Sequence, residues 1–320
     1  MGRLALYAFG LWVGLTGSTD AQTWPAKQPI RTVVPFTAGS ATDIMARAVL
    51  DEVGRAIGQT FVIENRVGAG GTIGAAAVAK AEPDGYTILV HSSSHTITPS
   101  TYPNLSYDAV RDLPAVIPLG NLPNVLVVPP NKYQTIRDLV AAAKAKPGSL
   151  TYGSAGLGGA AHLNAERFRL SAGFEAVHVP FKGGPETLRE IIADRIDFYF
   201  SPALPALPLV REGQVRALAV STSKRALALP DLPTTIEAGY PNSDYNFWIG
   251  VFTAGGTPRE IINRLHGEIA KALEVPVIRD RMAKLGAEPM PMTPEQFDAY
   301  VKAEIESNAA LVQAAGIRAY

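Results

Sequence analysis

Two loops rich in small residues have the composition of anion-binding sites. The first spans residues 36–43, between an apolar strand and a helix, and the second spans residues 153–162 in the same setting. The first turn of a helix offers unpaired N–H groups at the positive end of its dipole, and small residues let a ligand approach them closely. We expect ligand contacts from Phe36, Thr37, Ala38, Gly39, Ser40, Ala41 and Asp43 in the first loop, and from Ser154, Ala155, Gly156, Gly158, Gly159, Ala160 and His162 in the second. One such loop in each half of a two-lobed protein predicts a cleft that holds a small carboxylate or phosphate from both sides.

Neither loop contains Lys or Arg, so the anion is expected to be held by N–H groups and hydroxyls. Arg47 follows Asp43 by one helical turn, and an ion pair between them is the simplest interpretation of that spacing. Lys182 begins another strand-to-helix junction, where it either faces the cleft or stays in solvent.

Residues 91–95 form a tract of hydroxyl and imidazole groups. His91 and His95 are separated by three serines, with no glutamate in a zinc-protease arrangement and no evident third ligand. We therefore interpret the tract as a polar loop near the cleft, with Ser92 as a ligand contact, and expect neither a metal nor a cofactor.

Two enzyme classes are the alternatives. Residues 156–161 match G-x-G-x-x-A after a strand, which is typical of dinucleotide binding, but Glu175 precedes the next strand instead of ending it. Residues 152–156 have the pattern of a hydrolase nucleophile elbow with Tyr in place of the first Gly. His178 lies on an expected strand and His266 inside an expected helix, which suits neither for a catalytic triad.

The N-terminus indicates export. Residues 1–3 are a short basic start, residues 4–15 are apolar, and residues 16–21 are small and polar, as in a signal peptide cleaved after residue 21. The chain has no cysteine, so neither disulfides nor a lipid-modified cysteine are expected. The chain has 29 basic and 29 acidic residues, and residues 1–21 contain one of each. The mature chain therefore has no net charge that would favour binding to nucleic acid or anionic lipid. We expect a free periplasmic monomer.

Strand and helix patterns alternate almost throughout, which predicts an α/β fold with mainly parallel sheets. The length favours two domains. Two strands near residues 124–130 and 245–254 are expected to carry the chain across, giving domain 1 (22–125 and 248–320) and domain 2 (126–247). Residues 201–208 contain three prolines, so we expect a stiff loop there with at most one helical turn. The expected strands are 31–34, 60–64, 86–91, 116–119, 125–128, 150–152, 176–179, 197–200, 215–220 and 248–253, and the expected helices are 41–57, 72–79, 136–146, 160–171, 186–193, 258–273, 276–285 and 294–315.

Several short motifs resemble one known family. They are residues 24–36, 43–47, 64–71, 83–87, 152–162, 178–183, 216–220, 229–234 and 238–241. Together, in this order, they closely resemble the Bug-type periplasmic receptors of tripartite tricarboxylate transporters. The resemblance implies a type II periplasmic binding protein with two α/β lobes that close on one carboxylate. It also implies that the loops 35–43 and 152–162 hold that carboxylate through backbone N–H groups, hydroxyls and ordered water.

The chain departs from the family pattern at four places. Ser40 follows Gly39 where a Gly-Gly pair is usual, Leu157 replaces a polar residue, and Gly159 replaces Ser or Thr. Ser201, followed by Pro202, stands where an acidic residue is common, and we include both among the ligand contacts. Fewer polar groups in the distal cleft favour a more apolar acid over an amino acid or citrate-like ligand.

The expected function is capture of a small mono- or dicarboxylate, aromatic or otherwise apolar, for a tripartite tricarboxylate-type permease or a sensor. The alternative is a hydrolase-like or nucleotide-dependent enzyme. A receptor binds its ligand stoichiometrically and does not consume it, which separates the two.

Overall fold

The computed structural model describes residues 24–284 and 286–318. The expected signal segment, residues 1–21, lies outside the described residues. The strands are β1 Ile30–Val34, β2 Phe61–Asn65, β3 Thr87–Ser92, β4 Ala115–Leu122, β5 Asn124–Val128, β6 Thr151–Ser154, β7 Val177–Pro180, β8 Phe198–Pro202, β9 Arg216–Val220 and β10 Phe247–Thr253. The α-helices are α1 Ala41–Ile57, α2 Thr72–Ala79, α3 Thr98–Thr101, α4 Ile136–Ala145, α5 Ala160–Ala172, α6 Gly184–Ile192, α7 Ala203–Arg211, α8 Arg259–Glu274, α9 Pro276–Lys284 and α10 Pro294–Ala314, with short 3₁₀ helices η1 Ala69–Gly71 and η2 Ser93–Thr96.

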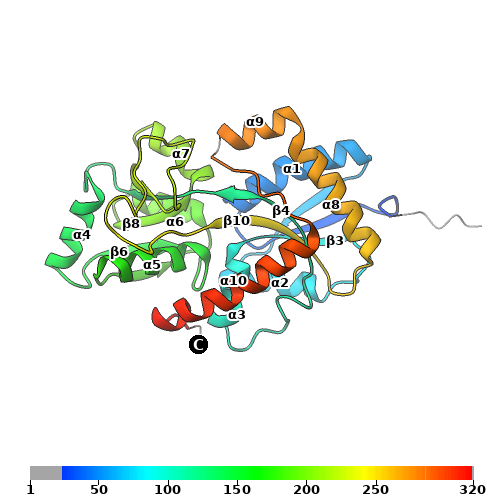
Figure 1. Ribbon diagram of the computed structural model, residues 1–320, viewed down its shortest axis with the longest axis horizontal. Coiled ribbons are helices and arrows are strands. Elements are labelled where there is room, and N and C mark those ends of the chain that lie inside the picture. Colours follow the sequence, from blue (N-terminus) through cyan, green and yellow to red (C-terminus); the bar gives the residue numbers. More distant parts are fainter. Residues whose placement is uncertain (1–23, 285, 319–320) are drawn as a thin grey trace, which may run out of the picture.

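The strands form two five-stranded sheets, one in each lobe (Figure 1). The first has the order β2-β1-β3-β10-β4 and the second β7-β6-β8-β5-β9. In the first sheet only β10 is antiparallel to its neighbours, and in the second only β5 is. The expectation of mainly parallel sheets is therefore confirmed. We call the half built on the first sheet lobe 1 and the half built on the second sheet lobe 2.

The chain changes sheet twice. It leaves lobe 1 between β4 and β5 and returns between β9 and β10, so each antiparallel strand is the first strand after a crossing. A chain segment that crosses from the other lobe enters the sheet at the end where the neighbouring strands finish. The entering strand therefore runs in the direction opposite to its neighbours. The domain boundaries given above stay a prediction.

All ten expected strands and all eight expected helices are found at the predicted places, with shifts at their ends. The expectation of a loop at residues 201–208 is wrong, because α7 occupies most of this segment. Pro205 lies in the first turn, where its missing N–H costs no intrahelical bond, and only Pro208 removes one. Burial of Leu204 and Leu207 on one face favours the helix.

The two lobes pack directly on each other. One hydrophobic cluster joins Met45 and Phe247 of lobe 1 with Ala160, Leu163 and Leu204 of lobe 2. In Figure 1, β10 runs from lobe 2 into lobe 1, and α10 lies below it and reaches toward α5. Among the described residues, no helix combines the length and the apolar character that crossing a membrane requires.

Candidate ligand-binding site

The first loop is organised by its own side chains. Ser40 is the N-cap of α1, and its Oγ accepts the N–H of Asp43 at 3.3 Å. Gly39 adopts φ +79°, a conformation that favours glycine, and donates its N–H to the Asp43 carboxylate at 3.0 Å. The loop is thereby tied to the first turn of the helix that it precedes.

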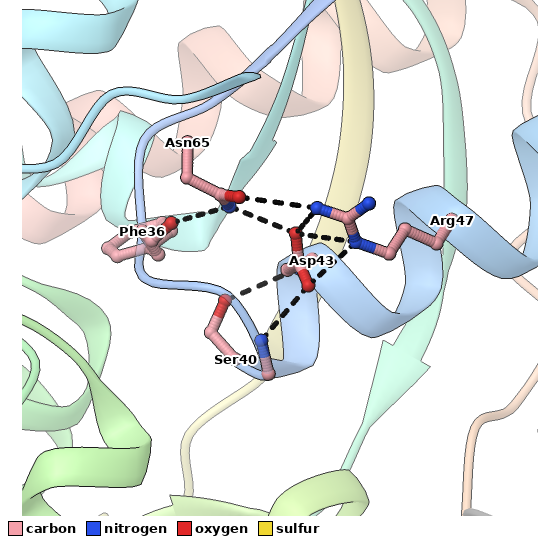
Figure 2. A network of polar contacts seen from close by, with 6 residues as sticks. Phe36, Ser40, Asp43, Arg47 and Asn65 are labelled. Atoms are coloured by element: carbon pink, nitrogen blue, oxygen red, sulfur yellow. Dashed lines mark hydrogen bonds and ion pairs between the residues drawn. The ribbon is translucent and has the colours of Figure 1, made fainter. Parts of the chain in front are cut away.

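Asp43 is buried and lies at the centre of a polar network (Figure 2). Arg47 pairs with its carboxylate at 2.9 Å, which confirms the expected ion pair, and Asn65 donates to it at 2.9 Å. The same Asn65 amide donates to the Phe36 carbonyl, also at 2.9 Å. Burial alone would raise the pKa of the Asp43 carboxyl, but the hydrogen bonds from Arg47, Gly39 and Asn65 lower it. Asp43 therefore holds the loop in place and keeps its charge inside this network.

The second loop has a different organisation. The N-cap of α5 is Gly159, which has no side-chain oxygen to accept an N–H of the first turn. Gly158, at φ +66°, donates its N–H to Nδ1 of His162 at 3.1 Å. A Cβ added to Gly158 would lie 2.4 Å from the side chain of Thr101 in lobe 1. Glycine at this position therefore permits the lobes to approach.

Ser154 and His162 belong to a cluster inside lobe 2. Ser154 Oγ lies 2.6 Å from Nε2 of His178, and it also bonds to the N–H and carbonyl of Gly156. The rings of His162 and His178 stack with centroids 3.7 Å apart. Burial lowers the pKa of His162 to about 4 and, together with the nearby His162 ring, that of His178 to about 3. Both imidazoles are consequently neutral near pH 7.

The Ser154–His178 contact is a feature that sequence reasoning missed. His178 does lie on a strand, β7, as expected, but β7 pairs with β6 and brings the two residues together. The register places His178 opposite Tyr152, two residues before Ser154. Pairing register between parallel strands is a long-range property that spacing along the chain does not reveal.

An inner cavity of about 40 Å³ lies between the lobes. Three helices begin at its wall: α1 at Ala41, α5 at Ala160 and α6 at Gly184. The first-turn N–H groups of these helices have no intrahelical acceptor. In the part of the chain that the structure describes, no charged side chain lines this cavity. Its lining consists of Phe36, Ser40, Ala41, Thr42, Ser92, Ser94, Ala155, Ala160, Ala161, Gly184, Tyr199, Pro202, Pro205 and Phe247.

Two hydrogen bonds cross directly between the lobes at this cavity and beside it. Ser94 Oγ of lobe 1 accepts the N–H of Ala160 in lobe 2 at 2.9 Å. Tyr102 of lobe 1 donates its hydroxyl to the carbonyl of Leu157 in lobe 2, also at 2.9 Å. These bonds, with the shared apolar cluster, hold the lobes in a closed arrangement.

The structure brings seven of the predicted residues into this one lining, from both lobes: Phe36, Ser40, Ala41, Ser92, Ala155, Ala160 and Pro202. The other predicted residues lie outside it. In the first loop, the residues behind the lining are Thr37, Ala38, Gly39 and Asp43. In lobe 2, they are Ser154, Gly156, Gly158, Gly159, His162 and Ser201.

Lys182 is exposed and lies at an outer groove with Gly70 and Phe181, so its position fits the solvent interpretation better than contact with the inner cavity. Sequence reasoning missed Thr42, Ser94, Ala161, Gly184, Tyr199, Pro205 and Phe247. Three of them, Thr42, Ser94 and Ala161, are within two residues of predicted contacts. Their place in the same loop or first helical turn is the signal that could have identified them. Tyr199 and Phe247 lie on strands whose facing depends on how the lobes dock, so no local signal marks them.

Two α/β lobes that close around a small cavity are typical of two-lobed solute-binding proteins. Residues 45–317 match the family described as the tripartite tricarboxylate transporter family receptor, and the chain belongs to this family. It is 36% identical over 310 residues to protein BugT of Bordetella pertussis, covering 95% of this chain and 94% of that protein. It is 37% identical over 295 residues to the UPF0065 protein of the tcbD-tcbE intergenic region of a Pseudomonas species, covering 91% and 88%.

Solved structures agree with this assignment. An R. palustris protein solved with adipate superposes with a TM-score of 0.89 at 34% identity, covering 92% of this chain and all of that chain. MatC from Rhodopseudomonas palustris, solved with bound malate, gives 0.85 at 29% identity and covers 90% and 99%. Because the chain belongs to this receptor family, it is a solute-binding receptor and not an enzyme.

Proposed function

We propose that this receptor captures a small organic carboxylate in the inner cavity and presents it to the permease of a tripartite tricarboxylate-type transporter or to a sensor. The observation that carries the proposal is the meeting of three helix N-termini at a cavity lined by hydroxyls and by no charged side chain of the described residues. Helix N-termini attract anions through their dipoles and their unpaired N–H groups. A carboxylate bound there has donors from both lobes, which favours closure around it.

The donors identify the kind of recognition. Ala41 and Thr42 begin α1, Ala161 lies in the first turn of α5, and the hydrogen-bonded hydroxyls of Ser92 and Ser94 have one hydrogen left for the ligand. Each hydrogen bond to a charged group contributes about 1.5 to 3 kcal/mol, so a few of them account for micromolar affinity, which is roughly 8 kcal/mol. A cationic side chain is not required for binding of this strength.

The remaining walls favour a compact acid with an apolar body. Phe36, Tyr199, Pro202, Pro205 and Phe247 contribute aromatic and proline surfaces. A cavity of about 40 Å³ has room for about three water molecules at roughly 10 to 15 Å³ each, so a longer acid requires the lobes to stand further apart. The adipate and malate of the two R. palustris proteins are therefore included among the acids that we propose to test.

The proposal includes the cellular setting. We propose that residues 1–21 are removed on export and that the mature chain works in the periplasm as a monomer, with domain 1 formed by residues 22–125 and 248–320 and domain 2 by residues 126–247. N-terminal sequencing of the exported protein tests the cleavage. Light scattering of the purified protein tests the monomer.

Calorimetric titration with acetate, benzoate, malate, adipate and citrate tests the function. We expect saturable 1:1 binding of at least one compact acid, with the acid recovered unchanged and its amide binding at least about a hundredfold more weakly. Equal affinity for acid and amide, or consumption of the ligand, would contradict the proposal.

A further inference from the structure

Ser94, in lobe 1, contacts the first turn of a helix in lobe 2. Its Oγ accepts the Ala160 N–H at 2.9 Å, and both residues line the inner cavity. The N-cap position of α5 is Gly159, which has no side-chain oxygen to offer. Ser94 therefore gives one of the first-turn N–H groups of α5, which lack an intrahelical acceptor, a partner from the opposite lobe, and we call this contact the cap.

The hydrogen bonds of Ser94 leave one donor unassigned. Ser92 donates its hydroxyl to Ser94 Oγ at 3.1 Å. A serine hydroxyl has one hydrogen and two lone pairs, and Ser92 and Ala160 occupy both lone pairs of Ser94. The hydrogen of Ser94 then needs an acceptor, and the cavity is the space that its side chain lines. If the two serines exchanged donor and acceptor roles, Ser92 would have the remaining hydrogen, and Ser92 lines the same cavity.

The segment that carries Ser94 is fixed by its neighbours. Thr96 Oγ1 donates to the backbone carbonyl of Ser93 at 2.8 Å, and it accepts a hydrogen bond from the Asn308 amide on α10 at 3.0 Å. All residues of η2 are buried. Ser94 consequently projects from a rigid part of lobe 1. The distance from its hydroxyl to the Ala160 N–H therefore depends on how far apart the lobes stand.

We propose that Ser94 couples ligand binding to lobe closure: its oxygen accepts the N–H of Ala160 across the cleft, and its hydrogen is donated to a carboxylate oxygen of the ligand. The second half rests on the proposed function. A hydroxyl that already accepts two hydrogen bonds is polarised and donates more strongly, and a carboxylate is the strongest acceptor available. The acid therefore strengthens the contact that joins the lobes, and closure depends on the acid through one side chain.

Three serines of the same tract make a matched set of variants in the full mature chain. Ser94→Ala removes the cap and the donor, and we expect affinity for the best acid of the panel to fall at least about tenfold. Ser92→Ala leaves the cap in place and weakens only the polarisation, so a loss of about two- to fivefold is expected. Ser93→Ala is the control, because Ser93 bonds to Tyr245 and lies outside the cavity lining of the described residues, and it should change affinity less than about twofold.

Closure is measured separately and without ligand. The chain has no cysteine, so Lys80→Cys on lobe 1 and Arg189→Cys on lobe 2, both exposed, permit specific labelling with a dye pair. We expect Ser94→Ala to shift the distance distribution toward longer values, and Ser93→Ala to leave it unchanged. Equal distributions in the wild type and Ser94→Ala would overturn the capping half. Unchanged acid affinity in Ser94→Ala would overturn the ligand half, whereas a wild type that binds no acid of the panel overturns the proposed function, and the ligand half with it.

Discussion

The two loops that meet at the cavity are stabilised in different ways. The first loop is capped within its own lobe, by Ser40 on α1 and by the network of Asp43, Arg47 and Asn65. The second loop has Gly159 at its N-cap and receives an acceptor from Ser94 in the other lobe. The first N-terminus is therefore organised before the lobes meet, and the second is completed by their meeting. Similar sequence patterns can thus provide one preorganised half-site and one that depends on closure.

The largest expected effect concerns the network of the first loop. Asp43→Ala removes a buried carboxylate that bonds to Gly39, Arg47 and Asn65, and we expect a loss of about 2 to 4 kcal/mol in the free energy of unfolding. Urea unfolding measures this loss. The matched control is Asp51→Ala, which breaks an exposed ion pair with Arg55 on the same helix and should leave stability unchanged. Equal effects of the two substitutions would refute the organising role of Asp43.

The next effect separates backbone strain from lobe contact. Gly158→Val places a side chain against Thr101, and we expect at least about a hundredfold loss of acid affinity, roughly 2.7 kcal/mol, because the lobes no longer close. Gly173→Val is the control, since Gly173 has nearly the same φ of +65° but nothing within 4 Å of an added Cβ. Calorimetry on both variants should find a binding defect only in Gly158→Val. A similar defect in both would assign the effect to strain alone.

The histidine pair of lobe 2 predicts a pH dependence of stability. The pKa values in the folded protein, about 4 for His162 and about 3 for His178, lie below the ordinary histidine pKa of about 6.5. The unfolded chain therefore binds more protons than the folded chain as the pH falls below about 6.5. The contribution of these residues to the free energy of unfolding is present above that pH and is lost toward pH 3 to 4. One such histidine lowers the free energy of unfolding by about 2 kcal/mol between pH 7 and pH 5.

Replacement of one histidine tests this assignment. His178→Gln should reduce the difference in unfolding free energy between pH 7 and pH 5 by about this amount of roughly 2 kcal/mol, whatever it does to stability at pH 7. Urea titrations at both pH values provide the measurement. An unchanged difference would show that other groups cause the acid sensitivity.

The smallest effect is expected at Lys182. Its side chain is exposed and lies at the outer groove, so Lys182→Ala should weaken acid binding by less than about threefold. Calorimetry with the best acid of the panel checks this value. A loss as large as that of Gly158→Val would point to a charge-based site at the mouth of the cleft.

Local signals in the sequence predicted most elements and both loops. The ends of α1 and α2 agree with the predicted ranges, and a capping box of Thr293 and Gln296 marks the start of α10. The predicted start of α8 is shifted by one residue, because Pro258 takes the N-cap position and Thr257 donates its hydroxyl to the Ala254 carbonyl. Proline content misled the prediction for α7, where tertiary burial outweighs the helix-breaking tendency.

The candidate site was predicted only in part, for a physical reason. Phe36, Ser40, Ala41 and Ala160 follow from the strand–loop–helix pattern, which is local. The contacts of Ser94 with Ala160, of Gly158 with Thr101 and of Ser154 with His178 depend on lobe docking and strand register. Those are long-range properties, so a glycine expected to admit a ligand proves to admit the other lobe.

A crystal structure of the receptor with the tightest-binding acid of the panel would show how the carboxylate is held. We expect carboxylate oxygens within about 3 Å of first-turn N–H groups of α1 and α5, with Ser92 or Ser94 as a further donor. We also expect no Lys or Arg in contact with the carboxylate. A carboxylate paired with Lys182 or another cationic side chain, and distant from both helix N-termini, would contradict binding by helix N-termini.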